Sequence, residues 1–77
     1  MQKEIITDSW SERVARLMEL VARKTEAIRI HQQQEKPDKL AIEQYEQKRA
    51  EYLNELSDLM QTYGIRVKFE ILPLLAA

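Results

Sequence analysis

The feature that most constrains this chain is a pair of heptad-patterned stretches of similar length, separated by one proline-marked break. A repeat of 3.5 residues, sustained over several turns, keeps one face of an α-helix against a partner helix. The sequence therefore predicts two helices that pair along a seam, as in a coiled coil. The seam positions are Trp10, Val14, Leu17, Val21, Lys24, Ile28 and His31 in the first stretch, and Ile42, Tyr45, Arg49, Tyr52, Leu56, Leu59 and Tyr63 in the second.

Local signals bound the two helices. Ser9 and Glu12 have the spacing of a capping box, which predicts a first helix over residues 9–33. Pro37 suits the first turn of a helix, where a missing N–H costs nothing, and predicts a second helix over residues 37–63. The short connection and the matched lengths predict an antiparallel helical hairpin.

After the second helix the period changes from 3.5 to 2. Gly64, the only glycine, fits the left-handed residue that ends a helix. Residues 65–72 then alternate as a half-buried strand does, and the composition of residues 3–7 predicts a second strand or an arm. The hairpin would bring these segments together, so we expect them to pair with each other or with a neighbouring chain, with Phe69 near Trp10. The candidate strand-pairing side chains are Ile65, Val67, Phe69 and Ile71.

The length of 77 residues predicts a single domain over residues 1–77. A domain of this size buries only about 60% of the surface of its unfolded chain, so its core is marginal. Additional apolar side chains widen the seam beyond what one facing helix covers, and this favours a homodimer that forms a four-helix bundle. The predicted fold class is mainly α, a two-helix hairpin with a short terminal β element. The widening residues are Met18, Leu20, Leu53 and Met60.

Composition narrows the classes of function. The net charge of −1, with 32% charged residues, lacks the basic excess that is typical of nucleic-acid-binding proteins. No stretch approaches the ~18 apolar residues of a membrane span, and the amino terminus lacks the apolar core of a signal peptide. We therefore expect a small cytoplasmic protein that does not enter the membrane.

No group of residues indicates catalysis. The chain has no cysteine and one histidine, His31, so a metal site is not expected. Glu43 with Glu46, and Glu55 with Asp58, resemble the acidic pairs of all-α nucleotide pyrophosphohydrolases. Both pairs lie on one predicted helix, whereas those enzymes bring them from separate helices. We therefore expect neither an enzyme nor a bound cofactor.

These observations favour a non-catalytic protein–protein interaction module, such as a small adaptor, a chaperone-like protein or an assembly subunit. The predicted interaction seam consists of Trp10, Val14, Leu17, Val21, Ile28, Tyr45, Tyr52, Leu56, Leu59 and Tyr63. The alternative is a nucleic-acid-binding helical hairpin dimer, similar in size and layout to the plasmid-copy-control RNA-binding hairpin. Its phosphate contacts would come from Arg13, Arg16, Arg23 and Arg29.

Overall fold

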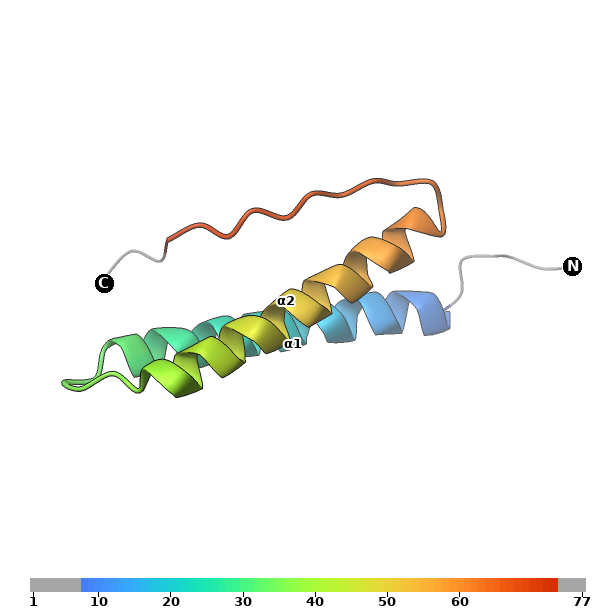
Figure 1. Ribbon diagram of the computed structural model, residues 1–77. Coiled ribbons are helices and arrows are strands. Elements are labelled where there is room, and N and C mark those ends of the chain that lie inside the picture. Colours follow the sequence, from blue (N-terminus) through green and yellow to red (C-terminus); the bar gives the residue numbers. More distant parts are fainter. Residues whose placement is uncertain (1–7, 74–77) are drawn as a thin grey trace, which may run out of the picture.

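The computed structural model describes residues 8–73, which form two α-helices followed by an extended segment. Helix α1 spans Asp8–Gln32 and helix α2 spans Lys39–Gln61, with 25 and 23 residues. A short loop joins them, and they lie side by side and antiparallel (Figure 1). The predicted helical hairpin is therefore confirmed. Within residues 8–73, neither helix combines the length and the hydropathy required to span a membrane.

The helix ends lie within two residues of the predicted bounds, and α2 is the helix that differs more. Asp38 has extended backbone angles, with φ −85° and ψ 96°, and its carboxylate accepts a hydrogen bond from the backbone N–H of Ala41 at 3.1 Å. Asp38 is therefore the N-cap, which leaves Pro37 outside the helix. At the other helix, α1 already begins at Asp8, so Ser9 lies inside it and is not its N-cap.

Gly64 ends the second helix as predicted. Its φ of 76° lies in the left-handed region, and its N–H donates to the carbonyl oxygen of Gln61 at 2.9 Å. The N–H of Ile65 donates to the carbonyl oxygen of Met60 at 3.1 Å. These two bonds form a Schellman motif, which satisfies carbonyls that the helix leaves free. The chain then turns back along α2 (Figure 1).

The predicted β element is wrong where the structure describes it. Residues 65–73, which we call the tail, are extended, but no strand occurs within residues 8–73. A strand requires ladder hydrogen bonds to a neighbouring strand. Within the described chain, residues 66–73 make no backbone–backbone hydrogen bond, so the tail has no such neighbour. Residues 3–7, the predicted partner strand, lie outside the described residues.

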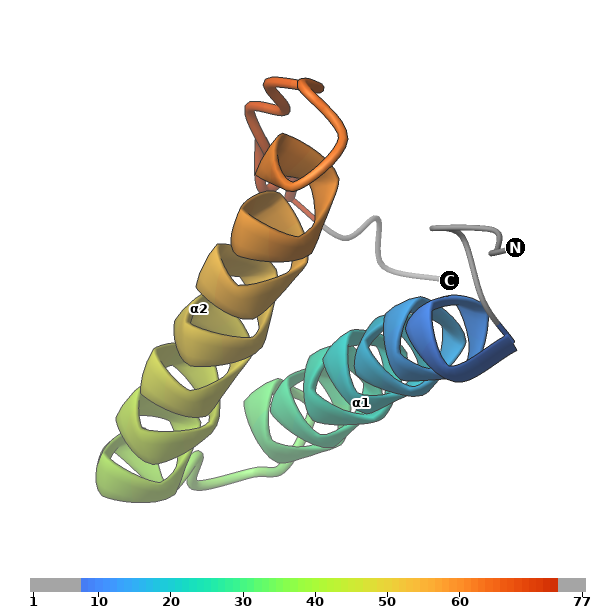
Figure 2. The same ribbon diagram turned by 90° about the vertical axis from the view of Figure 1, so that its right-hand side faces the viewer.

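The course of the tail also corrects the expected position of Phe69. Phe69 lies beside Ala50 and Leu53 of α2, because the tail runs back toward the loop rather than across the open end of the hairpin. Trp10 instead meets the ring of Tyr63 edge-on, with ring centroids 4.9 Å apart and an interplanar angle of 80°. Figure 2 shows the tail close to α2, well apart from the first turns of α1.

The core is small and lies in the middle of the seam. Within the described residues only Leu17, Ile28 and Leu56 are buried hydrophobic side chains, and of these Leu56 alone is fully buried, at 0% exposure. The radius of gyration is 15.6 Å, whereas a compact chain of this length would have about 11–12 Å. In an elongated hairpin the two helices contact each other along a single interface. Most side chains outside this seam therefore remain near solvent.

Candidate functional site

The predicted seam is occupied by the two helices of the hairpin itself. Each of its predicted side chains is buried or half-buried: Trp10, Val14, Leu17, Val21, Ile28, Tyr45, Tyr52, Leu56, Leu59 and Tyr63. The indole N–H of Trp10 donates to the backbone carbonyl oxygen of Leu59 at 3.2 Å, which ties the start of α1 to the end of α2. These side chains therefore pack the two helices of the hairpin against each other.

The two charged seam residues make contacts across the helices. The Lys24 ammonium nitrogen lies 5.3 Å from the centroid of the Tyr45 ring, within cation–π range. The Arg49 guanidinium donates to the Thr25 hydroxyl at 3.1 Å. The His31 ring also packs on Tyr45, with centroids 5.4 Å apart, and its buried Nδ1 has no hydrogen-bond partner among residues 8–73. These contacts fix how far one helix is displaced along the other.

The arginines predicted for phosphate contact all face carboxylates. Arg13 crosses the seam to Glu55 at 3.0 Å, and Arg16 and Arg23 both approach Glu19, at 3.8 and 2.8 Å. These side chains are largely exposed, so the individual pairs contribute little to stability. A phosphate at any of these positions would have to compete with a carboxylate for the arginine.

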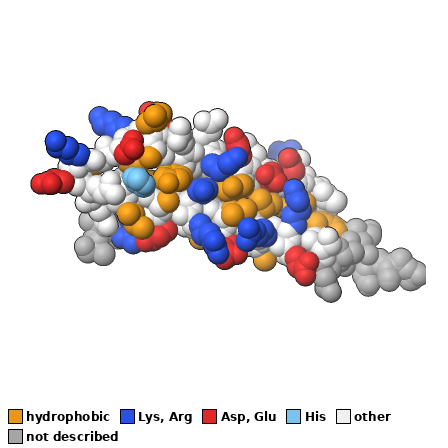
Figure 3. Space-filling view, turned by 90° about the horizontal axis from the view of Figure 1, so that it is seen from below, with side chains coloured by type: hydrophobic (Ala, Val, Ile, Leu, Met, Phe, Trp, Pro, Cys, Tyr) orange, Lys and Arg blue, Asp and Glu red, His pale blue; other side chains and the backbone are white. Residues whose placement is uncertain are grey.

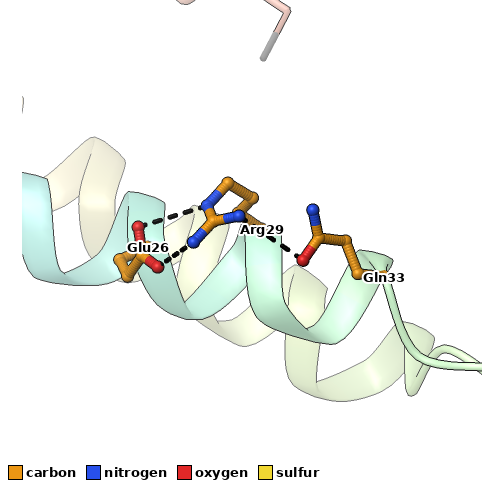
Figure 4. A network of polar contacts seen from close by, with 3 residues as sticks. All are labelled: Glu26, Arg29 and Gln33. Atoms are coloured by element: carbon orange, nitrogen blue, oxygen red, sulfur yellow. Dashed lines mark hydrogen bonds and ion pairs between the residues drawn. The ribbon is translucent and has the colours of Figure 1, made fainter. Parts of the chain in front are cut away.

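Arg29 belongs to a small polar network near the end of α1 (Figure 4). Its Nε donates to one carboxylate oxygen of Glu26 at 3.2 Å, a second guanidinium nitrogen bonds the other oxygen, and a third reaches the Gln33 side chain at 3.4 Å. This bidentate contact lowers the pKa of Glu26 and raises that of Arg29. The hydrogen bond and charge of Arg23 lower the pKa of Glu19 in the same way.

The face of the hairpin opposite the tail is mixed in character. Figure 3 shows hydrophobic side chains gathered along its middle, with lysines, arginines and acidic side chains on both sides. The additional apolar residues predicted to widen the seam are only partly covered. Leu20, Leu53 and Met60 are half-buried, while Met18 is exposed. These residues border the seam without forming a second buried layer.

The tail is the main exposed apolar segment of the described chain. Seven large hydrophobic side chains are exposed in residues 8–73, and four of them belong to the tail. The four are Ile65, Phe69, Ile71 and Leu72, with exposures of 47%, 38%, 54% and 67%. Val67, between them, is half-buried. Most of the exposed large hydrophobic side chains of residues 8–73 therefore lie in the tail, which includes the residues predicted to pair.

The tail covers α2 incompletely. A hollow of about 310 Å³ remains where its middle crosses α2, lined by Ala50, Leu53, Asn54, Ser57, Val67, Lys68 and Phe69. A second hollow of about 290 Å³ lies near its end, lined by Ile28, Gln32, Glu46, Arg49, Ile71, Leu72 and Pro73. Since protein interiors are close-packed, hollows of this size mean that the tail rests on the helices without completing a core.

Sequence reasoning missed two of the residues that matter here. Thr25, which accepts the hydrogen bond of Arg49, stands outside the heptad pattern, and only its place beside Lys24 could have suggested a role. Leu72 is not among the predicted strand-pairing side chains, yet it is the most exposed large hydrophobic side chain described. Among residues 8–73, no three or more His, Cys, Asp or Glu side chains are grouped to hold a metal ion.

The chain matches no family model, no curated protein and no solved structure.

Proposed function

We propose that this chain is a non-catalytic protein–protein interaction module that associates with a second copy of itself. The observation that carries the proposal is that, among the described residues, only three hydrophobic side chains are buried whereas seven large ones are exposed. Exposed apolar surface in one segment favours association, because covering it removes it from water. In this role the protein would be a small adaptor, a chaperone-like binder or an assembly subunit.

Two hairpins would bring four helices together, as in a four-helix bundle. The charge of the chain supports such an assembly. A net charge of −1 produces little repulsion between copies. Glu55 and Glu51, two of the acidic residues of α2, already face Arg13 and Lys48 at 3.0 and 3.3 Å. Part of the negative charge of α2 is therefore neutralised within each hairpin.

The paired arginines favour a protein partner over a nucleic acid. A nucleic-acid-binding dimer would need Arg13, Arg16, Arg23 and Arg29 to leave their carboxylates. Binding to RNA or DNA would also weaken steeply as salt rises, because counterions are released from the phosphates. Fluorescence anisotropy with labelled single-stranded and duplex probes, at low and at high salt, distinguishes the two functions. We expect no salt-dependent binding.

Light scattering coupled to size exclusion tests the proposal directly. From about 1 to about 500 µM protein, the mass should rise from that of one chain, 9.1 kDa, to twice that value, since dimer formation follows mass action. A mass that stays at one chain over this whole range would contradict the proposal.

A further inference from the structure

We infer that the tails of two copies pair as antiparallel strands, related by a two-fold axis at Phe69. The inference rests on the proposed self-association and names the segment that carries it. The exposed surface of the tail is therefore covered by the tail of a second copy of this chain.

The backbone of the tail defines which residues are free to pair. Ile65 already donates its N–H to Met60, and Pro73 has no N–H. Between them, the residues from Arg66 to Leu72 are extended and make no backbone–backbone hydrogen bond within the described chain. Such a row of free donors and acceptors is a template for another strand. The midpoint of this row is Phe69, which sets the axis of a symmetric pair.

The side chains agree with this register. With Phe69 on the axis, Lys68 lies opposite Glu70 of the second copy, and the symmetry produces this pair twice. Val67 lies opposite Ile71, also twice, and the two Phe69 rings meet at the centre. Opposite charges and apolar or aromatic pairs are the combinations that stabilise antiparallel strands. A shift of one residue would set charged side chains against apolar ones, and a shift of two would bring like charges together.

The pairing also accounts for the exposure of the tail. Side chains of an extended segment alternate between two faces, which assigns Val67, Phe69 and Ile71 to the same face. Val67 is half-buried and lines the hollow over α2. In the pair, Ile71 of the second copy comes beside Val67, next to the hollow over Ala50 and Leu53. Opposite Arg66 lies Leu72 of the other copy, and the aliphatic stem of the arginine would cover that side chain.

The outer face of α2 permits a second hairpin at this position. Gln47, Asn54 and Gln61 recur every seven residues there and are all exposed. Asn54 borders the same hollow as Lys68 and Phe69, so this stripe of amides lies beside the pairing segment. Two copies meeting here would bring these neutral amide groups close to one another. Side-chain amides both donate and accept hydrogen bonds, which suits contact between identical surfaces.

Disulfide trapping tests the register, because the chain has no cysteine of its own. Full-length Arg66→Cys and Leu72→Cys are prepared with different mass tags, mixed, oxidised and analysed by mass spectrometry. The predicted pair places the thiol of one variant directly opposite the thiol of the other, within about 5 Å between Cβ atoms. In a pair of two Arg66→Cys chains, the thiols would lie about 20 Å apart, at about 3.3 Å per residue. We expect the mixed disulfide to exceed both self-disulfides by at least about tenfold, since a disulfide needs close Cβ atoms.

A charge exchange tests the energetics of the same pair. Lys68→Glu sets like charges opposite each other twice, and we expect it to weaken dimerisation about tenfold. Lys68→Glu combined with Glu70→Lys restores opposite charges and should return the dimer to near its original affinity. Lys36→Glu, the same charge change in the exposed loop, is the matched control and should leave dimerisation within about twofold.

The outcomes separate the inference from the proposed function. A dimer that gives no excess of the mixed disulfide, or that is not restored by the charge exchange, associates through another surface. That result would overturn the tail pairing and leave the proposed self-association standing. A chain that remains monomeric at every concentration would overturn both.

Discussion

The seam and the tail both contain many apolar residues, but the two regions differ in how much of their side chains is exposed to solvent. Leu56, in the seam, is 0% exposed, and Leu72, in the tail, is 67% exposed. A helix satisfies its own backbone and needs a partner only for one face, which the second helix of the same hairpin provides. An extended segment needs a neighbouring strand for its backbone as well. Residues 8–73 provide each helix with a partner helix, but they provide the tail with no neighbouring strand.

The largest expected effect tests the seam. Leu56→Ala should lower the free energy of unfolding by about 2–5 kcal/mol, because it removes buried methyl groups and leaves a cavity in a small core. Denaturant melts followed by circular dichroism measure the change. The matched control is Gln44→Ala, on the exposed part of α2, which should stay within about 0.5 kcal/mol of the original chain. Equal losses would mean that the seam does not carry the stability.

The second prediction compares amide exchange in the two regions. Every second amide from Arg66 to Leu72 should exchange fast in dilute protein and at least about tenfold more slowly where the dimer dominates, because alternate residues of an antiparallel strand donate their N–H to the partner strand. Amides around Leu56 bond within α2 and should change much less. Hydrogen exchange measured by NMR at two protein concentrations gives both values. Tail amides that are equally protected at every dilution would show that they pair within one chain.

The third prediction concerns Gly64, the joint between the two regions. Gly64→Ala should cost about 1 kcal/mol, because a side chain disfavours the left-handed backbone that Gly64 adopts. Apart from Gly64 and its two chain neighbours, no atom of residues 8–73 lies within 4 Å of the position that a Cβ would take, so the cost should come from the backbone alone. Gly64→Asn is the matched comparison and should cost less, since asparagine tolerates this conformation better. Thermal melts of the two variants rank the costs, and equal costs would exclude the backbone as the cause.

The smallest expected effect is the pH dependence of α1. Arg23 and Arg29 lower the pKa values of Glu19 and Glu26 in the folded chain below the ordinary value of 4.5. Their stabilising contribution is therefore present above that value and is lost as pH falls through the folded pKa values. Both carboxylates are exposed, so the loss should be slight. Melting temperatures between neutral and acidic pH should fall less in the Glu19→Gln, Glu26→Gln double variant than in the original chain.

The sequence by itself determined the hairpin. Leu17, Ile28 and Leu56 lie at heptad seam positions, and all three are buried, because the period of an α-helix fixes which side chains share a face. Gly64 ended the second helix as its type predicts, since only local backbone geometry decides that position. The extended form of the tail also agrees with its alternating pattern. Which side chains share a helix face, where a helix ends and where the chain is extended each depend on residues that are close together in the chain.

Only the tertiary structure decided how distant segments meet. The contacts of Arg49 with Thr25, and of Lys24 with the Tyr45 ring, depend on the displacement of one helix along the other, which a heptad pattern leaves open. The same is true of the tail, whose period of 2 predicts an extended chain but cannot supply a neighbour. Its direction follows from the turn after α2, which sets Phe69 beside α2 instead of near the start of α1. Burial and pairing are properties of two segments together, so one segment's pattern cannot specify them.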